Sequence, residues 1–202
     1  MPLVDMNVKA GWDSLYSLHD VAADARILGS NTLGFERKAK ARILGDDHWR
    51  LRDALALAPG QKIALIGAGF GWVAEDWIAA GLSVVATDTS TWIQANKAMN
   101  ATVAILNEDA ASTASRRRIL QAAGLPNNGK FDWIITEDIL PGLSDAEVAL
   151  LLPELRKFAV KVAHWVSVLQ PGAEQDVRLN WKSLATWKLL VTPDSVVWRG
   201  TA

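Results

Sequence analysis

The sequence predicts one α/β domain built around a mostly parallel β-sheet. Three observations favour this fold class. Short apolar runs alternate with helical stretches from Lys62 onward, a glycine-rich segment directly follows the first run, and Asp88 ends the second. The chain has 202 residues, of which 50% are hydrophobic, and this is enough to bury the core of a single domain. We expect one domain over 1–202, with a helical layer or lid over 1–60 and a ligand-binding core over 61–202.

The N-terminal segment carries the pattern of helices separated by glycine and proline. A helix capped by Asp13 and a second helix over about 35–44 are expected. Asp46 or Asp47 can cap a third helix with one apolar face, which Pro59-Gly60 then breaks. These helices are expected to lie in front of the sheet.

Five apolar runs after this segment predict parallel strands, because helical stretches separate them and such crossovers connect parallel strands. The runs are IALIG from Ile63, SVVATD from Ser83, TVAIL from Thr102, FDWIIT from Phe131 and AHWVSVL from Ala163. The connecting helices are expected over 72–80, 91–99, 112–123 and 144–161.

The C-terminal segment predicts a short helix over about 179–186 and then a β-hairpin. The runs WKLLVT and SVVWRG are rich in β-forming residues, and Pro193-Asp194 between them suits a turn. This hairpin brings the predicted sheet to seven strands, one of them antiparallel.

Composition excludes several classes of function. The 21 basic and 22 acidic residues nearly cancel, so no whole-molecule field attracts nucleic acid or an anionic membrane. The absence of cysteine excludes disulfides, thiolate nucleophiles and cysteine-based metal sites. No signal-peptide pattern and no run of about 18 apolar residues is found, so we expect a soluble, cytoplasmic protein. Most of the ten tryptophans are expected to pack in the core.

The segment Gly67-Ala68-Gly69-Phe70-Gly71 is the expected ligand site. It lies between a strand and a helix, where glycines allow a tight turn and the close approach of a ligand to the backbone. Asp88 follows Gly67 by 21 positions and ends the next strand, where a carboxylate can accept hydrogen bonds from both hydroxyls of a ribose. A purely structural turn is the alternative, but strand, glycines, helix and acid in this order favour an adenosine-containing ligand.

Trp72 helps to choose between the possible adenosine ligands. In the dinucleotide-binding fingerprint a third glycine falls at this position and permits close packing of helix and strand. A tryptophan there disfavours NAD and favours a cofactor without a pyrophosphate. An NAD-dependent oxidoreductase stays an alternative, because Asp88 alone is compatible with it.

With these features the chain resembles the class I S-adenosylmethionine (SAM)-dependent methyltransferases over roughly residues 51–199, in the stretches ALIGAGFGWVAEDW, VVATDTS, AILNEDA and FDWIITEDIL. The resemblance implies a Rossmann-like three-layer sandwich, with SAM bound by the core over 61–202. It implies that Gly67 and Gly69 line the methionine part of SAM and that Asp88 holds the ribose. It also implies that Asp109-Ala110 approach the adenine, although Asp109 could instead cap the helix that follows. The neighbouring residues Ala68, Phe70, Thr89 and Glu137 complete the expected cofactor-binding set.

Two departures from the family pattern bear on activity. Leu65 stands where the family often has an acidic residue, which leaves the cofactor amine one partner short. No Asn/Asp-Pro-Pro-Tyr motif follows the fourth strand, and this disfavours methylation of adenine or cytosine amino groups. We therefore expect a methyltransferase that acts on a small molecule, with nucleic acid an unlikely partner. A non-catalytic SAM-binding module is the alternative that Leu65 suggests.

Few side chains are candidates for acid–base chemistry. Glu137 and Asp138 are the candidate bases, because they follow the carboxyl end of a central strand, where ligands bind in open α/β sheets. Solvated loop acids are the alternative for both. His164 lies in a predicted buried strand and is expected to be a hydrogen-bonded core residue. The basic cluster 116–118 could contact phosphate or a carboxylate, but a solvated helix face is the favoured interpretation.

Overall fold

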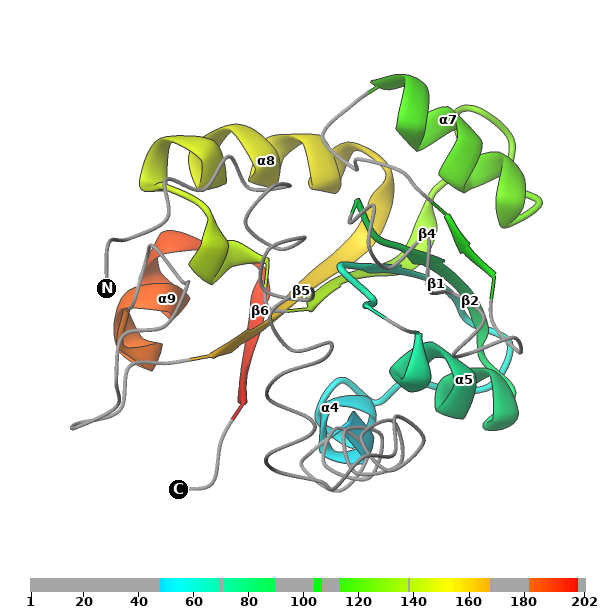
Figure 1. Ribbon diagram of the computed structural model, residues 1–202, viewed down its shortest axis with the longest axis horizontal. Helices are drawn as coiled ribbons and strands as arrows, with labels where there is room; N and C mark the ends of the chain where they lie inside the picture. Colours follow the sequence, from blue (N-terminus) through cyan, green and yellow to red (C-terminus); the bar gives the residue numbers. More distant parts are fainter. Residues whose placement is uncertain are drawn as a thin grey trace, which may run out of the picture.

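The computed structural model describes residues 48–69, 71–89, 104–106, 113–137, 139–167 and 182–199. A parallel sheet of six strands forms the centre of this part of the chain (Figure 1), in the order β3-β2-β1-β4-β5-β6. The strands are β1 (Lys62–Ile66), β2 (Ser83–Thr87), β3 (Ile105–Leu106), β4 (Phe131–Glu137), β5 (Ala159–Ser167) and β6 (Ser195–Arg199). The helices are α4 (His48–Ala54), α5 (Trp72–Ala79), α7 (Thr113–Ala122), the 3-10 helix η2 (Leu140–Gly142), α8 (Asp145–Lys157) and α9 (Leu184–Leu190).

Helices cover both faces of the sheet and give three layers. Along β1, Ile63 and Leu65 pack into one core with α4 and α5, whereas Ala64 and Ile66 pack into a second core with α7, α8 and α9. This alternation follows from the two-residue period of a strand, and continuous burial is typical of a parallel sheet with both faces covered. Figure 1 shows the two helical layers on opposite sides of the strands. The predicted α/β sandwich is therefore confirmed.

The sheet order creates a switch point between β1 and β4. From β1 the chain builds outward through β2 to β3, and it then builds β4, β5 and β6 on the other side of β1. In open α/β sheets a ligand crevice forms beside such a switch point, outside the carboxyl ends of the strands. The glycine-rich segment at the end of β1 lies at this place.

Strands β1, β2 and β4 start within one residue of their predicted runs, and β3 lies inside its run. Strand β5 begins earlier than expected. The helix predicted over 144–161 begins correctly, at a capping box in which the Ser144 hydroxyl accepts from Glu147 N (3.3 Å) and the Glu147 carboxylate accepts from Ser144 N (2.8 Å). It ends at Lys157, because the Phe158 carbonyl already accepts a hydrogen bond from Phe131 N at 3.0 Å, where pairing with β4 begins.

The predicted C-terminal hairpin is wrong. The run WKLLVT lies in α9 and the turn after it, and β6 pairs with β5 in parallel register. The Ser183 hydroxyl caps α9 by accepting from Thr186 N (3.2 Å), and Trp187 and Val191, four residues apart, are both fully buried. Helical burial of these side chains outweighs the β propensity of the run. The described residues thus contain six strands and no antiparallel pair.

Other sequence predictions fall largely outside the described residues. The first two N-terminal helices and the helix over 91–99 lie outside them, and so does the start of the run TVAIL. Of the helical layer predicted over 1–60, α4 is described, and its Leu51 is buried against the sheet. No helix within the described ranges is long and apolar enough to cross a bilayer.

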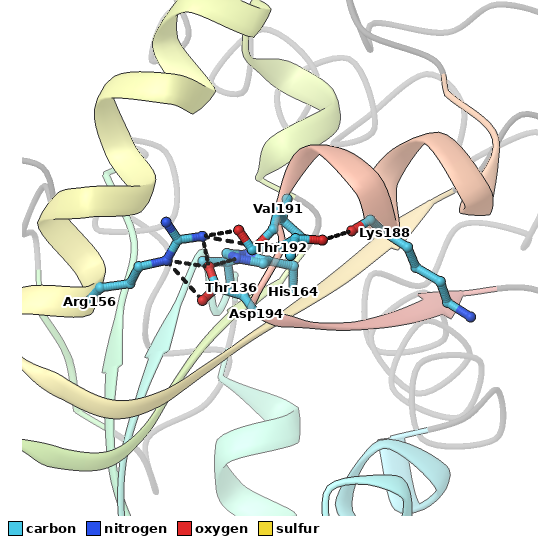
Figure 2. A network of polar contacts seen from close by, with 7 residues as sticks. All are labelled: Thr136, Arg156, His164, Lys188, Val191, Thr192 and Asp194. Atoms are coloured by element: carbon cyan, nitrogen blue, oxygen red, sulfur yellow. Dashed lines mark hydrogen bonds and ion pairs between the residues drawn. The ribbon is translucent and has the colours of Figure 1, made fainter.

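An arginine fixes the segment that leads into β6. Arg156, near the end of α8, donates from Nε to Asp194 Oδ1 (2.9 Å) and from Nη2 to Asp194 Oδ2 (2.9 Å), as Figure 2 shows. The same Nη2 donates to the carbonyls of Val191 (2.9 Å) and Thr192 (3.2 Å). The Asp194 side chain is only 5% exposed. Bidentate pairing of a buried carboxylate fixes distance and orientation together, so α8 sets the position of β6.

We expect Arg156→Met to lower the free energy of unfolding by about 2–3 kcal/mol, because the buried Asp194 carboxylate loses its charged partner and the carbonyls of Val191 and Thr192 each lose a donor. Lys157→Met is the matched control on the same helix. Lys157 is 63% exposed and pairs at the surface with Glu154, so its loss should cost less than about 1 kcal/mol. Urea unfolding measures both, and equal losses would contradict the role given to Arg156.

Candidate functional site

The glycine-rich segment forms a tight turn at the carboxyl end of β1. Gly67, Gly69 and Gly71 have φ values of +78°, +53° and +76°, in the left-handed region that glycine adopts without strain. The N–H groups of Gly67 and Ala68 both donate to the Thr87 carbonyl at 2.9 Å, which ties the turn to the end of β2. Gly71 N donates to the Ala68 carbonyl at 2.8 Å, and α5 begins directly afterwards.

Asp88 braces this turn from the neighbouring strand. Asp88 is 8% exposed, and its carboxylate accepts a hydrogen bond from Gly69 N at 2.9 Å through Oδ2. Its own N–H donates to the Leu106 carbonyl at 3.0 Å, so Asp88 is also anchored to β3. Two predicted site residues, 19 positions apart, therefore meet at the carboxyl edge of the sheet.

The end of β4 forms the other side of the site. A Cβ added to Gly67 would lie 2.7 Å from Ile139 Cγ1 and 2.8 Å from the Glu137 carbonyl oxygen. No real side chain tolerates both distances, so glycine is required here for close approach as well as for its φ. The half-buried candidate base Glu137 thus stands directly beside the glycine turn.

Gly67→Ala separates these two requirements when it is compared with Gly60→Ala. Gly60 has a similar φ of +83° but no atom within 4 Å of an added Cβ. Both variants carry a backbone cost of about 1–2 kcal/mol, and only Gly67→Ala adds the clash with β4, for a further loss of about 1–3 kcal/mol. Thermal or urea unfolding measures the difference in the free energy of unfolding. Equal losses of stability would show that the end of β4 moves aside without an energetic cost.

Some predicted site residues cannot be placed. Phe70, Asp109, Ala110 and Asp138 lie outside the described residues. Thr89 is half-buried and directly follows Asp88, and Ala68 is buried in the core with α5. Within the described ranges no group of three or more His, Asp or Glu residues could hold a metal ion.

Two site residues were missed from the sequence. Thr87 binds the turn through its carbonyl oxygen, a contact that side-chain patterns do not reveal, although its place directly before Asp88 was a usable signal. Ile139 packs against Gly67 from a loop after β4, and only the tertiary structure brings the two together.

Solved structures with a similar fold include SAM-dependent methyltransferases. Magnesium protoporphyrin IX methyltransferase from Synechocystis PCC 6803 with bound S-adenosylhomocysteine (SAH) matches with a TM-score of 0.56 at 16% identity, over 90% of this chain and 82% of that chain. The same enzyme with bound SAM matches with a TM-score of 0.53 at 18% identity, over 88% and 83%. A SAM-dependent methyltransferase from Archaeoglobus fulgidus matches with a TM-score of 0.50 at 17% identity, over 87% and 72%.

The chain has the class I methyltransferase fold. The predicted fold is thereby confirmed. No protein-family model matches the sequence, and no curated protein matches it either. At these identities the likeness concerns the methyltransferase fold itself.

A buried polar network anchors the β4 side of this methyltransferase fold. Thr136, next to Glu137, contacts His164 Nδ1 through its hydroxyl at 2.9 Å, and His164 Nε2 lies 3.2 Å from Asp194 Oδ2 (Figure 2). Thr136 and His164 are fully buried. Because a carboxylate only accepts, Nε2 carries the imidazole proton, and Nδ1 accepts from Thr136. The prediction of a hydrogen-bonded core histidine is confirmed.

Burial sets the charge of this histidine. It lowers the pKa of His164 below the ordinary value of 6.5, although the hydrogen bond and charge of Asp194 act in the opposite direction. Burial raises the pKa of Asp194, but hydrogen bonds from His164 and Arg156 outweigh this and leave that pKa below its ordinary 3.8. At neutral pH the network therefore consists of a neutral imidazole, a carboxylate and a guanidinium.

We expect this network to make the methyltransferase fold sensitive to acid. The unfolded chain binds a proton on this histidine near pH 6.5, whereas the folded chain does so only at lower pH, so the free energy of unfolding falls as pH drops from about 7 to about 5. One such proton contributes at most about 1.4 kcal/mol per pH unit.

The His164→Gln variant isolates this contribution, because its amide can still donate to Asp194 but does not titrate. Urea unfolding across the same pH range should show a shallower pH dependence than in the wild type. An unchanged slope would assign the acid sensitivity to other groups. The pKa values of Glu147 and Glu154 are lowered from the ordinary 4.5, so these carboxylates change the free energy of unfolding only at lower pH.

Proposed function

We propose that this chain binds SAM in the glycine turn and transfers its methyl group to a small-molecule acceptor. The observation that carries the proposal is the turn braced by Asp88 beside the switch point of a methyltransferase fold. The Synechocystis structures, which contain SAM and SAH, support the same cofactor for this chain. The methyl-transfer activity and the class of acceptor belong to the proposal.

The residues of the turn suit such a cofactor. The backbone of Gly67 and Gly69 can approach the methionine part closely, since neither carries a side chain. A carboxylate can accept about four hydrogen bonds, so Asp88 can hold Gly69 N–H and also accept from ribose hydroxyls. The N-terminus of α5, which begins at the end of the turn, favours the carboxylate of the methionine part.

Bound SAM supplies an activated methyl group on a sulfonium, so the protein needs to do little covalent chemistry. The turn and β4 orient the cofactor, and an acceptor held in line beside it would need little further help. Glu137, at the edge of the site, is the described candidate to accept a proton from the acceptor. Glu137→Gln should slow turnover of a methyl acceptor that must lose a proton when it is methylated.

Leu65 bears on whether the chain is catalytic. It is fully buried in the core with α5 and α4, so this position contributes packing where an acid would contact the cofactor amine. A non-catalytic SAM-binding module is the second candidate function for this reason. An acceptor panel assayed for SAH release distinguishes the two, since a binding module forms the SAM complex and releases none.

Binding itself is tested by thermal unfolding with SAM and SAH. At a hundredfold excess over Kd, ligand stabilises the fold by about 2.7 kcal/mol, or about 5–10 °C for a chain of this size. Asp88→Asn should weaken binding about 10- to 100-fold, because hydrogen bonds to a charged group are lost. The control Asp53→Asn removes the same charge from an exposed site on α4 and should leave affinity unchanged.

If SAM and SAH at millimolar concentration do not stabilise the protein against thermal unfolding, the proposal is wrong. Saturable binding of NADH, followed by its fluorescence, would instead favour the NAD-dependent oxidoreductase that Asp88 permits.

A further inference from the structure

A concave surface lies away from the glycine turn. It is a pocket of about 240 Å³ between the first half of α7, the turn before β4 and the end of α8. The turn before β4 and the Lys157-Phe158 segment directly precede strands, so the pocket lies toward the amino ends of β4 and β5. The glycine turn lies at the carboxyl edge. The two sites share no residue, and their ligands can be tested separately.

The lining of this pocket is strongly cationic. Arg116, Arg117 and Lys157 line it, and none of the described lining residues is acidic. Among the described residues, Glu154 is the carboxylate that reaches these cations, and it pairs with Arg116 and, at 2.5 Å, with Lys157. Within that part of the chain three positive charges thus face one negative charge. This excess positive charge of two matches a dianion.

The geometry of the three cations assigns them different roles. Arg116 is held in place: its Nη2 donates to Thr113 Oγ1 at 2.6 Å, and its guanidinium lies 5.9 Å from the Phe158 ring centroid. Hydrogen bonds from Lys157 and Arg116 hold the pKa of Glu154 below its ordinary value, so this carboxylate stays charged. Arg117 is exposed, and no ion-pair partner for it is found among the described residues. Arg117 is therefore the cation most available to a ligand.

Neutral groups around these cations complete a site for a small ligand. Asn127 and Asn128 lie on a tight turn in which Gly129 N donates to the Pro126 carbonyl at 2.8 Å, and their amides can donate to anionic oxygens. Leu120 and Phe158 add an apolar floor. The volume lies below the roughly 300–1,000 Å³ of pockets that hold drug-sized ligands, so the occupant must be small.

We propose that this pocket binds the phosphate group of a small phosphomonoester. The fork of an arginine suits phosphate oxygens, and the charge of a monoester near neutral pH matches the excess in the pocket. The apolar floor takes the organic part of the ester. The proposal concerns a site of its own and holds whether or not the glycine turn binds SAM.

The test titrates the full chain with phenyl phosphate and with inorganic phosphate, at ionic strength held constant with sodium chloride. Calorimetry or phosphorus NMR measures Kd. We expect saturable binding of both, with phenyl phosphate the tighter. Arg117→Gln should weaken binding about tenfold, which is the effect of losing one charge-assisted hydrogen bond.

Arg118→Gln is the matched control, because it removes the same charge from the next residue of α7. Arg118 does not line the pocket and donates to Ser115 Oγ at 3.4 Å. Its loss should change Kd less than twofold. Equal weakening by both variants would overturn the proposal in favour of diffuse charge attraction, and so would the absence of saturable binding. Equal affinity for the two probes would overturn the assignment of a monoester.

Discussion

At Gly67, directly after β1, the backbone passes so close to the end of β4 that a side chain has no room. This approach occurs at the switch point, where the sheet turns from building β2 and β3 to building β4, β5 and β6. The turn packs against the end of β4 on one side. On the other side Asp88, directly after β2, accepts a hydrogen bond from Gly69 N–H. The site is thus fixed by two neighbouring strands, and rigid strands position a site more accurately than a loop does alone.

The β4 side needs its own anchor, since its end carries both Glu137 and the residue that packs on Gly67. Thr136 supplies that anchor by bonding His164 in β5, and His164 in turn bonds Asp194 before β6. Arg156 then joins the chain of contacts to α8. A buried polar network with every member paired favours one arrangement of its strands. Strand order, helix packing and the wall of the glycine turn are coupled through these four side chains.

The parts of this structure that could be predicted from the sequence are those with a local signal. A strand is predicted by the run IALIG, a turn by the glycines that follow it, and the end of a second strand by Asp88. The structure brings these three together as expected. The alternation of apolar runs and helices gave the parallel sheet for the same reason. The contact of Ile139 with Gly67 carries no such signal, because it depends on which strands become neighbours.

The predicted C-terminal hairpin failed because the contacts that decide this segment also depend on the tertiary structure. WKLLVT is rich in residues that favour strands, yet Trp187 and Val191 find a buried surface only at helical spacing. Asp194 appeared to be a turn residue next to Pro193, and its role as the buried partner of Arg156 and His164 depends on α8 and β5. A propensity of a few tenths of a kcal/mol per residue cannot decide against the burial of a tryptophan, which is worth several times more.

The carboxyl ends and the amino ends of the strands carry side chains of opposite charge. At the carboxyl edge the acidic group Asp88 and a bare glycine backbone suit hydroxyls and a cationic sulfonium, whereas the amino-edge pocket gathers Arg116, Arg117 and Lys157 around one carboxylate. A whole-chain charge near zero hides this division, since it averages over the two edges. Screening over about 10 Å keeps the two fields apart in salt, so the charges at each end of the strands act separately. This is why the basic cluster on α7, which composition alone assigns to a solvated face, acquires a meaning only after the fold places Lys157 beside it.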